Sequence, residues 1–139
     1  MEKFNNWITF SLISFFLWGF WGMLPKLTTN YMHPKSAIIY ETLGCIIGGL
    51  IIFIAIGFKP EAHPKGILFA MLTGIFGLFG AFTFLFAMSK GKASVVVTMT
   101  ALYPILTILL SYFILHETVT LKQGIGIVFA LIAMVLFAA

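Results

Sequence analysis

Charged residues are scarce in this sequence. The 139 residues contain eight lysines and four glutamates but neither arginine nor aspartate, so only 9% of the chain is charged. A soluble domain carries about a quarter charged residues, because its surface must be polar. The composition therefore excludes a soluble globular domain. The lysines are also scattered singly rather than gathered in a basic patch, so we do not expect nucleic acid to be a partner.

Cysteine and catalytic motifs are also missing or rare. The single cysteine, Cys45, lies inside an apolar run, which excludes a disulfide framework or a cysteine-rich zinc site. We find no HExxH, GxSxG or P-loop motif. The three histidines lie apart from one another in polar connectors: His33, His63 and His116. We therefore expect no catalytic residues, no metal site and no cofactor, and a protein that is not an enzyme.

Long apolar runs make up most of the chain, which is 61% hydrophobic with a mean hydropathy of +1.11. The runs cover residues 7–24, 36–58, 65–88, 93–115 and 121–139. A run of about twenty apolar residues crosses the ~30 Å hydrocarbon core of a bilayer as an α-helix. Barrel strands instead alternate between polar and apolar residues. We predict an all-α polytopic membrane protein with five transmembrane helices in a single domain covering residues 1–139.

The lysines divide evenly between the two sides of the membrane that five crossings imply. One side carries Lys3, Lys59, Lys65 and Lys122, and the other carries Lys26, Lys35, Lys90 and Lys92. An excess of lysine and arginine in cytoplasmic loops normally sets the orientation. Two interpretations remain open. Either the first helix decides the orientation and the tally misleads, or copies insert both ways and pair antiparallel, which would build an inverted repeat.

Small residues recur within the predicted helices, where they allow close helix packing in lipid. They are Gly44, Gly48, Gly49, Gly74, Gly77, Gly80, Gly126 and Ala130. We expect most of them to make contacts inside the bundle, with one face, in run 121–139, left for oligomerisation.

Glu41 is the clearest polar candidate, because a charge inside a membrane helix costs several kcal/mol. It lies roughly 7–8 Å along its run from Ser36, by helical rise. One interpretation is a carboxylate near the interface that reaches water or pairs with Lys26 or Lys35. The other is a site residue that binds a cation or takes up a proton.

The end of the first run supplies further candidates. Two glycines and Pro25 precede Lys26 there, and proline removes a backbone donor, so we predict a bend or break at Pro25. Freed carbonyl groups bind substrates or ions where they line a cavity. Trp18, Trp21 and Lys26 thus join the candidate path, although Lys26 is equally consistent with an interfacial lysine that snorkels to water.

Pro104 falls near the middle of the fourth run and predicts a second helix break. Its missing N–H leaves a carbonyl near Thr100 without a donor. Thr100, Tyr103 and Thr107 are therefore candidates for a translocation path. The alternative is that these threonines only join neighbouring helices.

Several stretches together resemble the EamA repeat of the drug/metabolite transporter superfamily. They are Trp18–Lys26, Ala87–Val97, Thr100–Pro104, Leu115–Thr120 and Gln123–Gly124. The resemblance covers nearly the whole chain in the right order. Common EamA proteins carry two such repeats in ten helices, whereas this sequence is similar to single-repeat, five-helix members. The resemblance therefore implies that this chain forms half of a transporter built from two inverted five-helix repeats (5+5).

The resemblance also implies roles by analogy with the four-helix small-multidrug-resistance transporters, which work as antiparallel dimers. Those proteins use a glutamate in their first helix. Here no acid follows Glu2 in the first run, so a proton–drug antiport centred on that helix is not implied. In the EamA pattern, Glu117 is a structural residue at a helix end.

We interpret the sequence as a secondary transporter or exporter of small metabolites or drugs. It would work by alternating access as a homodimer, or as a dimer with a related repeat. The implied location is the cytoplasmic (inner) membrane of a bacterium or archaeon, with the lipid bilayer as its surroundings. The alternatives are a non-transporting membrane subunit and a lipid-carrier flippase subunit acting with a partner. The small-molecule substrate stays unknown.

Overall fold

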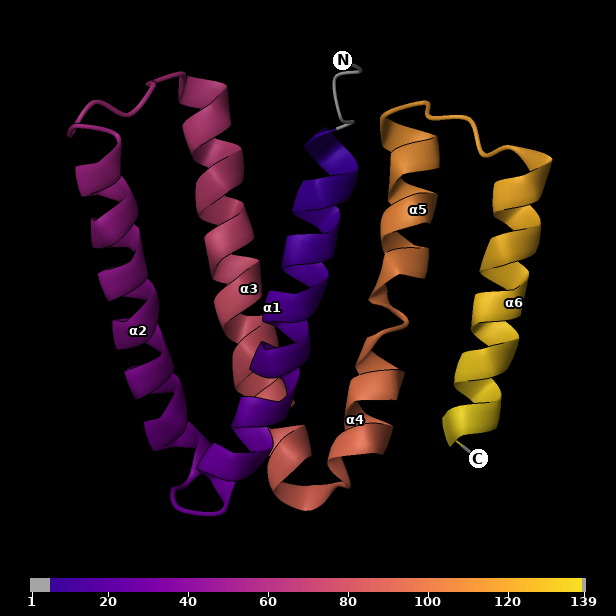
Figure 1. Cartoon of the computed structure of the whole chain (residues 1–139), viewed down its shortest axis with the longest axis horizontal. Coiled ribbons are helices and arrows are strands. Elements are labelled where there is room, and N and C mark those ends of the chain that lie inside the picture. The colour runs from indigo at the N-terminus through magenta and orange to yellow at the C-terminus, as the bar shows by residue number, and fades with distance from the viewer. Residues whose placement is uncertain (1–5, 139) are drawn as a thin grey trace. The chain divides into compact units, whose positions relative to one another are not determined.

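The computed structural model describes residues 6–138, and helices are the only regular secondary structure among them (Figure 1). Lys3 of the charge tally lies outside this range. The helices are α1 (Asn6–Thr29), α2 (Pro34–Ala55), α3 (Pro64–Lys90), α4 (Ala93–Thr100), α5 (Tyr103–Ile114) and α6 (Leu121–Ala138). Four stretches are long and apolar enough to cross a membrane: α1, α2, α3 and the α4–α5 stretch Ala93–Ile114. The predicted fifth crossing corresponds to α6, a shorter apolar helix.

The helices form two compact units. The first unit contains α1, α2 and α3 and ends at Lys90, and the second contains α4, α5 and α6 and begins at Gly91. In the first unit both α1 and α2 pack against α3, and in the second α4 packs against α6.

The core of the first unit lies at one end. Ala37 and Ile38, from the first turns of α2, pack against Ala81 and Leu85, from the last turns of α3. The side chain of Leu85 is 2% exposed. From this end, α2 and α3 diverge toward the connector at residues 56–63 (Figure 1). Tight packing is therefore confined to the end where α1, the start of α2 and the end of α3 meet.

The glycines expected to make close contacts inside the bundle do not make them. A Cβ atom added at any of the six glycines of α2 and central α3 would meet nothing within 4 Å: Gly44, Gly48, Gly49, Gly74, Gly77 and Gly80. The same holds for Gly126 of α6. The expected internal contacts are therefore absent within the first unit at the six positions of α2 and α3, because these helices converge only at the other end. At Gly126 an open face agrees with the expectation that run 121–139 leaves one face for oligomerisation.

The helix boundaries differ from the prediction where local chemistry decides them. α2 begins at Pro34 rather than at residue 36, because the His33 ring accepts a hydrogen bond from the Lys35 backbone N–H at 3.2 Å and caps the helix. It ends at Ala55 rather than at residue 58. Gly57 and Phe58 have φ angles of 68° and 60°, a left-handed conformation that ends a right-handed helix.

The first helix continues past the predicted end at Leu24 and runs to Thr29 with Pro25 inside it. Pro25 has no N–H to donate to the carbonyl of Trp21, four residues earlier, yet the loss of one backbone bond does not end the helix. Beyond Pro25, the Thr28 hydroxyl donates to the Leu24 carbonyl and the Thr29 hydroxyl donates to the Lys26 carbonyl, each at 3.1 Å. The helix is not broken at Pro25, so a break there is wrong, as is the predicted end at Leu24.

The fourth run is interrupted at Ala101–Leu102, between α4 and α5 (Figure 1). Pro104 lies at the start of α5 and has no N–H to donate to the Thr100 carbonyl. Thr100 itself donates its hydroxyl to the carbonyls of Val96 and Val97 at 2.9 Å. These two bonds link Thr100 to the preceding turn of α4, at the point where the helix is interrupted.

Candidate functional site

Two of the predicted site residues meet in the first unit. Trp21 of α1 donates its indole Nε1–H to Oε1 of Glu41 of α2, at 3.1 Å. The two residues lie twenty positions apart in the chain. They come together because α1 and α2 both run into the packed end of the unit. This hydrogen bond joins α1 to the second turn of α2, where Glu41 lies.

The Trp21 indole is held in a fixed orientation by Phe84 of α3. The two rings stack with centroids 5.3 Å apart and planes 14° apart. Phe84 is buried, whereas Trp21 is 42% exposed. One face of the indole is thus covered by α3, and its N–H edge is directed to the Glu41 carboxylate.

Lys26, a further predicted residue, joins α1 to the end of α3. Its Nζ donates to the Met88 carbonyl at 2.9 Å, and the Met88 side chain is fully buried. The last carbonyls of a helix lack intrahelical donors and carry partial negative charge, so an ammonium group stabilises them. Lys26 therefore neutralises the C-terminal end of α3 while it fixes α1 against that end.

These contacts make the packed end of the first unit chemically distinct. It holds a carboxylate bound by a neutral indole N–H, an aromatic stack, and an ammonium group that sits on helix carbonyls. The arrangement can bind a cation beside Glu41. Trp18 lies one turn before Trp21 on α1 and is 63% exposed, so it extends the aromatic surface along the same helix.

The predicted residues of the second unit lie along α4 and α5. Tyr103 is 58% exposed beside the helix interruption. The Thr107 hydroxyl donates to the Tyr103 carbonyl at 3.3 Å. The structure brings Trp21 and Glu41 into contact, whereas Thr100, Tyr103 and Thr107 follow one another along their own stretch of chain.

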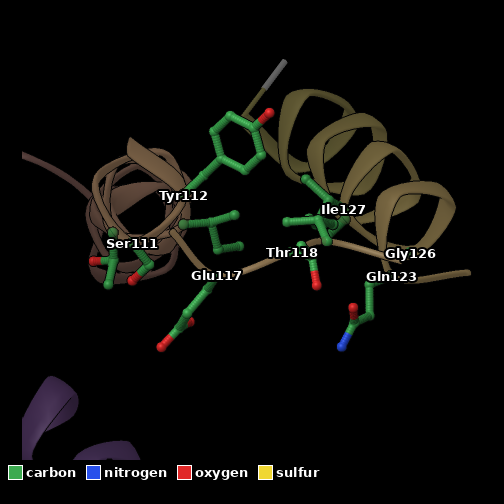
Figure 2. Close-up of a pocket in the computed structure, with 11 residues that line it drawn as sticks. Ser111, Tyr112, Glu117, Thr118, Gln123, Gly126 and Ile127 are labelled. Carbon is green, nitrogen blue, oxygen red and sulfur yellow. The ribbon is translucent and has the colours of Figure 1, made fainter. Parts of the chain in front are cut away.

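Thr107 also lines an open pocket of about 440 Å³ between α5, α6 and their connector (Figure 2). Gly126 and Ile127 line it from α6, and Ser111 and Tyr112 line it from α5. Figure 2 shows the side chains of Glu117, Thr118 and Gln123 extending to the same side of the connector. The pocket thus combines apolar walls with a polar edge.

The polar edge of this pocket was not predicted as a site. The resemblance assigned Glu117 a structural role at a helix end, and its backbone N–H donates to the Ser111 carbonyl at 3.3 Å. Gln123 accepts hydrogen bonds from the backbone N–H and the hydroxyl of Thr120, at 2.8 and 2.9 Å, and so caps the start of α6. The Thr120–x–x–Gln123 spacing, a capping box, was the signal that could have placed Gln123 at this helix start.

Comparison with known proteins gives one family match and two relatives. The model of the EamA-like transporter family matches residues 5–139. The uncharacterized protein MJ1333.1 of Methanocaldococcus jannaschii is 36% identical over 104 residues, which cover 72% of this chain and 76% of that protein. The uncharacterized transporter YyaM of Bacillus subtilis is 32% identical over 116 residues, which cover 81% of this chain but only 38% of YyaM. No solved structure matches this chain.

Proposed function

Because this chain belongs to the EamA-like transporter family, we propose that it is a secondary transporter that moves small molecules across a cytoplasmic membrane by alternating access. Members of this family are transporters rather than enzymes, and the chain is a multi-pass membrane protein. The observation that carries the proposal is the Trp21–Glu41 pair, a polar contact between two membrane helices. Charged groups at such depth are costly and mark substrate or ion pathways.

The transporting unit is a dimer of two such repeats, arranged antiparallel. Two features support this arrangement. The glycine faces of α2 and α3 are open, and small residues let another helix approach closely. The equal number of lysines on the two sides suits insertion in both orientations. A second copy of this chain, or a related repeat, would complete the inverted pair on which many transporters are built.

In the proposed dimer, the first unit of a chain would contribute the Trp21–Glu41 pair to the path, and the second unit would contribute the α4–α5 interruption. Interrupted membrane helices expose backbone carbonyls where they line a cavity. The exposed residues Trp18 and Tyr103 would lie along the path, and Thr107 would contribute a hydroxyl from α5. Lys26 would hold the packed end of the first unit rather than contact the substrate.

Labelling of single cysteines in intact cells tests the dual orientation. The background is Cys45→Ser, and the two probes are Ser89→Cys and Ala62→Cys, which fall in exposed positions on opposite sides of the predicted membrane. Neither change alters the lysine tally. If copies insert both ways, an impermeant thiol reagent labels about half of each variant from outside, because each site faces outward in half of the copies.

The result that contradicts dual insertion is complete labelling of one variant and none of the other. In that case the partner must be a different repeat of opposite orientation.

A cross-linking test then asks whether copies pair at all. Cysteines at Gly48 and at Gly77, each in turn, should cross-link between copies if the open glycine faces meet, whereas a cysteine at the exposed Ala62 should not.

A further inference from the structure

We propose that the Trp21–Glu41 pair binds the ammonium group of an organic cation, so that the substrates of this transporter are organic amines. This inference rests on the proposed transport function and names the substrate class for the same site. Four features of the first unit carry it: the charge of Glu41, its neutral donor, the position of the indole and the chemistry around the carboxylate.

Among residues 6–138, which the structure describes, Glu41 is the only acidic residue within a membrane helix. The other three glutamates lie at position 2, in the connector before α3 at Glu61, and in the connector before α6 at Glu117. A carboxylate inside a membrane helix is expensive and is retained at sites that bind or relay charge. Glu41 lies about 10 Å along α2 from Pro34, by helical rise. The membrane part of the chain thus carries its negative side-chain charge at this one position.

The donor that meets this carboxylate is uncharged. The Trp21 indole N–H orients the carboxylate through a hydrogen bond but leaves its negative charge in place. The ammonium group of Lys26, on the same helix as Trp21, is held at the Met88 carbonyl on the last turn of α3. A cationic ligand would therefore supply the positive charge that the Trp21–Glu41 contact itself does not.

The indole offers a second attraction to the same ligand. Stacking on Phe84 covers one face of Trp21, and the side chain remains 42% exposed. Tryptophan has the strongest attraction for cations among the aromatic rings, within about 6 Å of the ring centre. An ammonium group at the Glu41 carboxylate would gain this attraction only over the face of the indole that Phe84 leaves uncovered, because the ring edge carries partial positive charge. Its alkyl groups would contact exposed aromatic surface, including Trp18 one turn away.

An organic cation suits this site better than a metal ion or an anion. Metal ions such as calcium and magnesium take six or more oxygen ligands, and no group of three or more metal-binding side chains occurs among the described residues. The hydroxyl next to Glu41, that of Thr42, donates to the Ile38 carbonyl at 2.7 Å. An anion would be repelled by Glu41. A weakly hydrated ammonium group needs only the carboxylate and the ring.

Binding of radiolabelled choline to the full chain in lipid nanodiscs tests the inference. Choline carries a quaternary ammonium group, and 3,3-dimethylbutan-1-ol has the same shape without the charge. We expect choline to bind and the neutral alcohol not to compete. Glu41→Gln keeps an acceptor for Trp21 but removes the charge, and it should weaken choline binding by at least about tenfold. Glu61→Gln removes an equal charge from an exposed connector and should leave binding unchanged.

Tryptophan variants provide the second measurement. Trp21→Phe preserves a ring against Phe84 and should weaken choline binding by roughly threefold, because phenylalanine attracts cations less strongly. Trp7→Phe, at the far end of α1, is its matched control and should have no effect. Equal binding by the Glu41→Gln and Glu61→Gln variants would overturn the inference. Equal competition by the neutral alcohol, or by sodium ions, would overturn it as well.

Uptake into proteoliposomes separates this inference from the proposed function. If choline binds in a manner that depends on Glu41 but never crosses the membrane, the ammonium site stands, whereas the transport function fails and with it the assignment of organic amines as substrates. If neutral or anionic radiolabelled solutes are transported while choline does not bind, the transport function stands and the inference fails. Choline uptake that is abolished by Glu41→Gln and retained by Glu61→Gln supports both.

Discussion

The two units of this chain are stabilised in different ways. In the first, apolar side chains from two helices are buried together, and two polar contacts tie α1 to its neighbours: Trp21 to Glu41 and Lys26 to the Met88 carbonyl. In the second, the described residues of α4 and α5 include no buried side chain. Hydroxyl groups bond back to the carbonyls of their own helix in both units, so these bonds do not distinguish the two.

This difference indicates which unit can hold a fixed geometry alone. Lipid is as apolar as leucine, so helices in a membrane associate through close packing and hydrogen bonds rather than through the hydrophobic effect. The first unit has both kinds of contact at one end. The second has an interrupted helix and an open pocket, features expected of a segment that changes shape or completes its packing against another chain.

The largest expected effect is a loss of stability that depends on packing and therefore differs between the two units. Leu85→Ala in α3 removes a side chain that is 2% exposed and leaves a cavity in the first unit. We expect it to lower the free energy of unfolding by about 2–3 kcal/mol. Leu106→Ala in α5, where the side chain is 61% exposed, should cost less than about 0.5 kcal/mol. Unfolding by sodium dodecyl sulfate in lipid micelles measures both, and equal losses would show that the units are packed alike.

The next largest effect concerns the Lys26 ammonium group of α1, which donates to a carbonyl at the end of α3. Lys26→Met keeps the length of the side chain but leaves the Met88 carbonyl without this donor. A hydrogen bond that involves a charged group is worth about 1.5–3 kcal/mol, so we expect a loss near 2 kcal/mol in the same unfolding assay. Lys122→Met, at the exposed start of α6, is the matched control and should change stability little. A loss of similar size in both variants would mean that net charge, not this bond, matters.

A smaller effect is expected from the indole hydrogen bond. Trp21→Phe removes the donor to Glu41 but leaves an aromatic ring against Phe84. A neutral hydrogen bond contributes about 1 kcal/mol, and we expect a loss of that size. Trp18→Phe, one turn earlier and more exposed, should cost less. If Trp18→Phe is the more harmful change, the contact between α1 and α2 depends on that ring instead.

Much of the fold was predictable from the sequence, because membrane helices are set by length and apolarity alone. The five runs correspond to α1, α2, α3, the α4–α5 stretch and α6. The end of α1 was not predictable from Pro25, because a proline inside a membrane helix removes one backbone hydrogen bond without necessarily ending the helix. The role of the glycines was not predictable either, because a spacing of small residues does not say whether its partner is inside the chain or outside it.

The candidate site was predictable in its residues but not in its contacts. Glu41, Lys26 and Trp21 stood out because polar and aromatic groups in apolar runs are unusual. A direct pair between Lys26 and Glu41 was one of the open interpretations. The structure instead pairs Glu41 with Trp21 and places the Lys26 ammonium on the Met88 carbonyl. Only the meeting of three helices, which no local pattern encodes, decides between such partners.

The two prolines offer the finest comparison between the units. Pro25 lies inside a continuous helix, whereas Pro104 follows an interruption at Ala101–Leu102. Pro104→Ala restores an N–H that can bond the Thr100 carbonyl, so we expect α4 and α5 to join into one helix with a gain of at most about 1 kcal/mol. Pro25→Ala should leave α1 unchanged in shape. Spin labels at Val97 and Leu110, measured by pulsed electron paramagnetic resonance, should report a longer and narrower distance in Pro104→Ala alone.

The functional consequence of this change follows from the geometry of the interruption. If the break between α4 and α5 lets the second unit alternate between two shapes, a continuous helix removes that freedom, and choline uptake should fall in Pro104→Ala while choline binding at Trp21–Glu41 persists. Uptake that is unaffected by a straightened helix would show that the break is only a packing feature. Transport would then depend on motion at the open faces of α2 and α3, where the glycines leave room for a neighbouring chain to move.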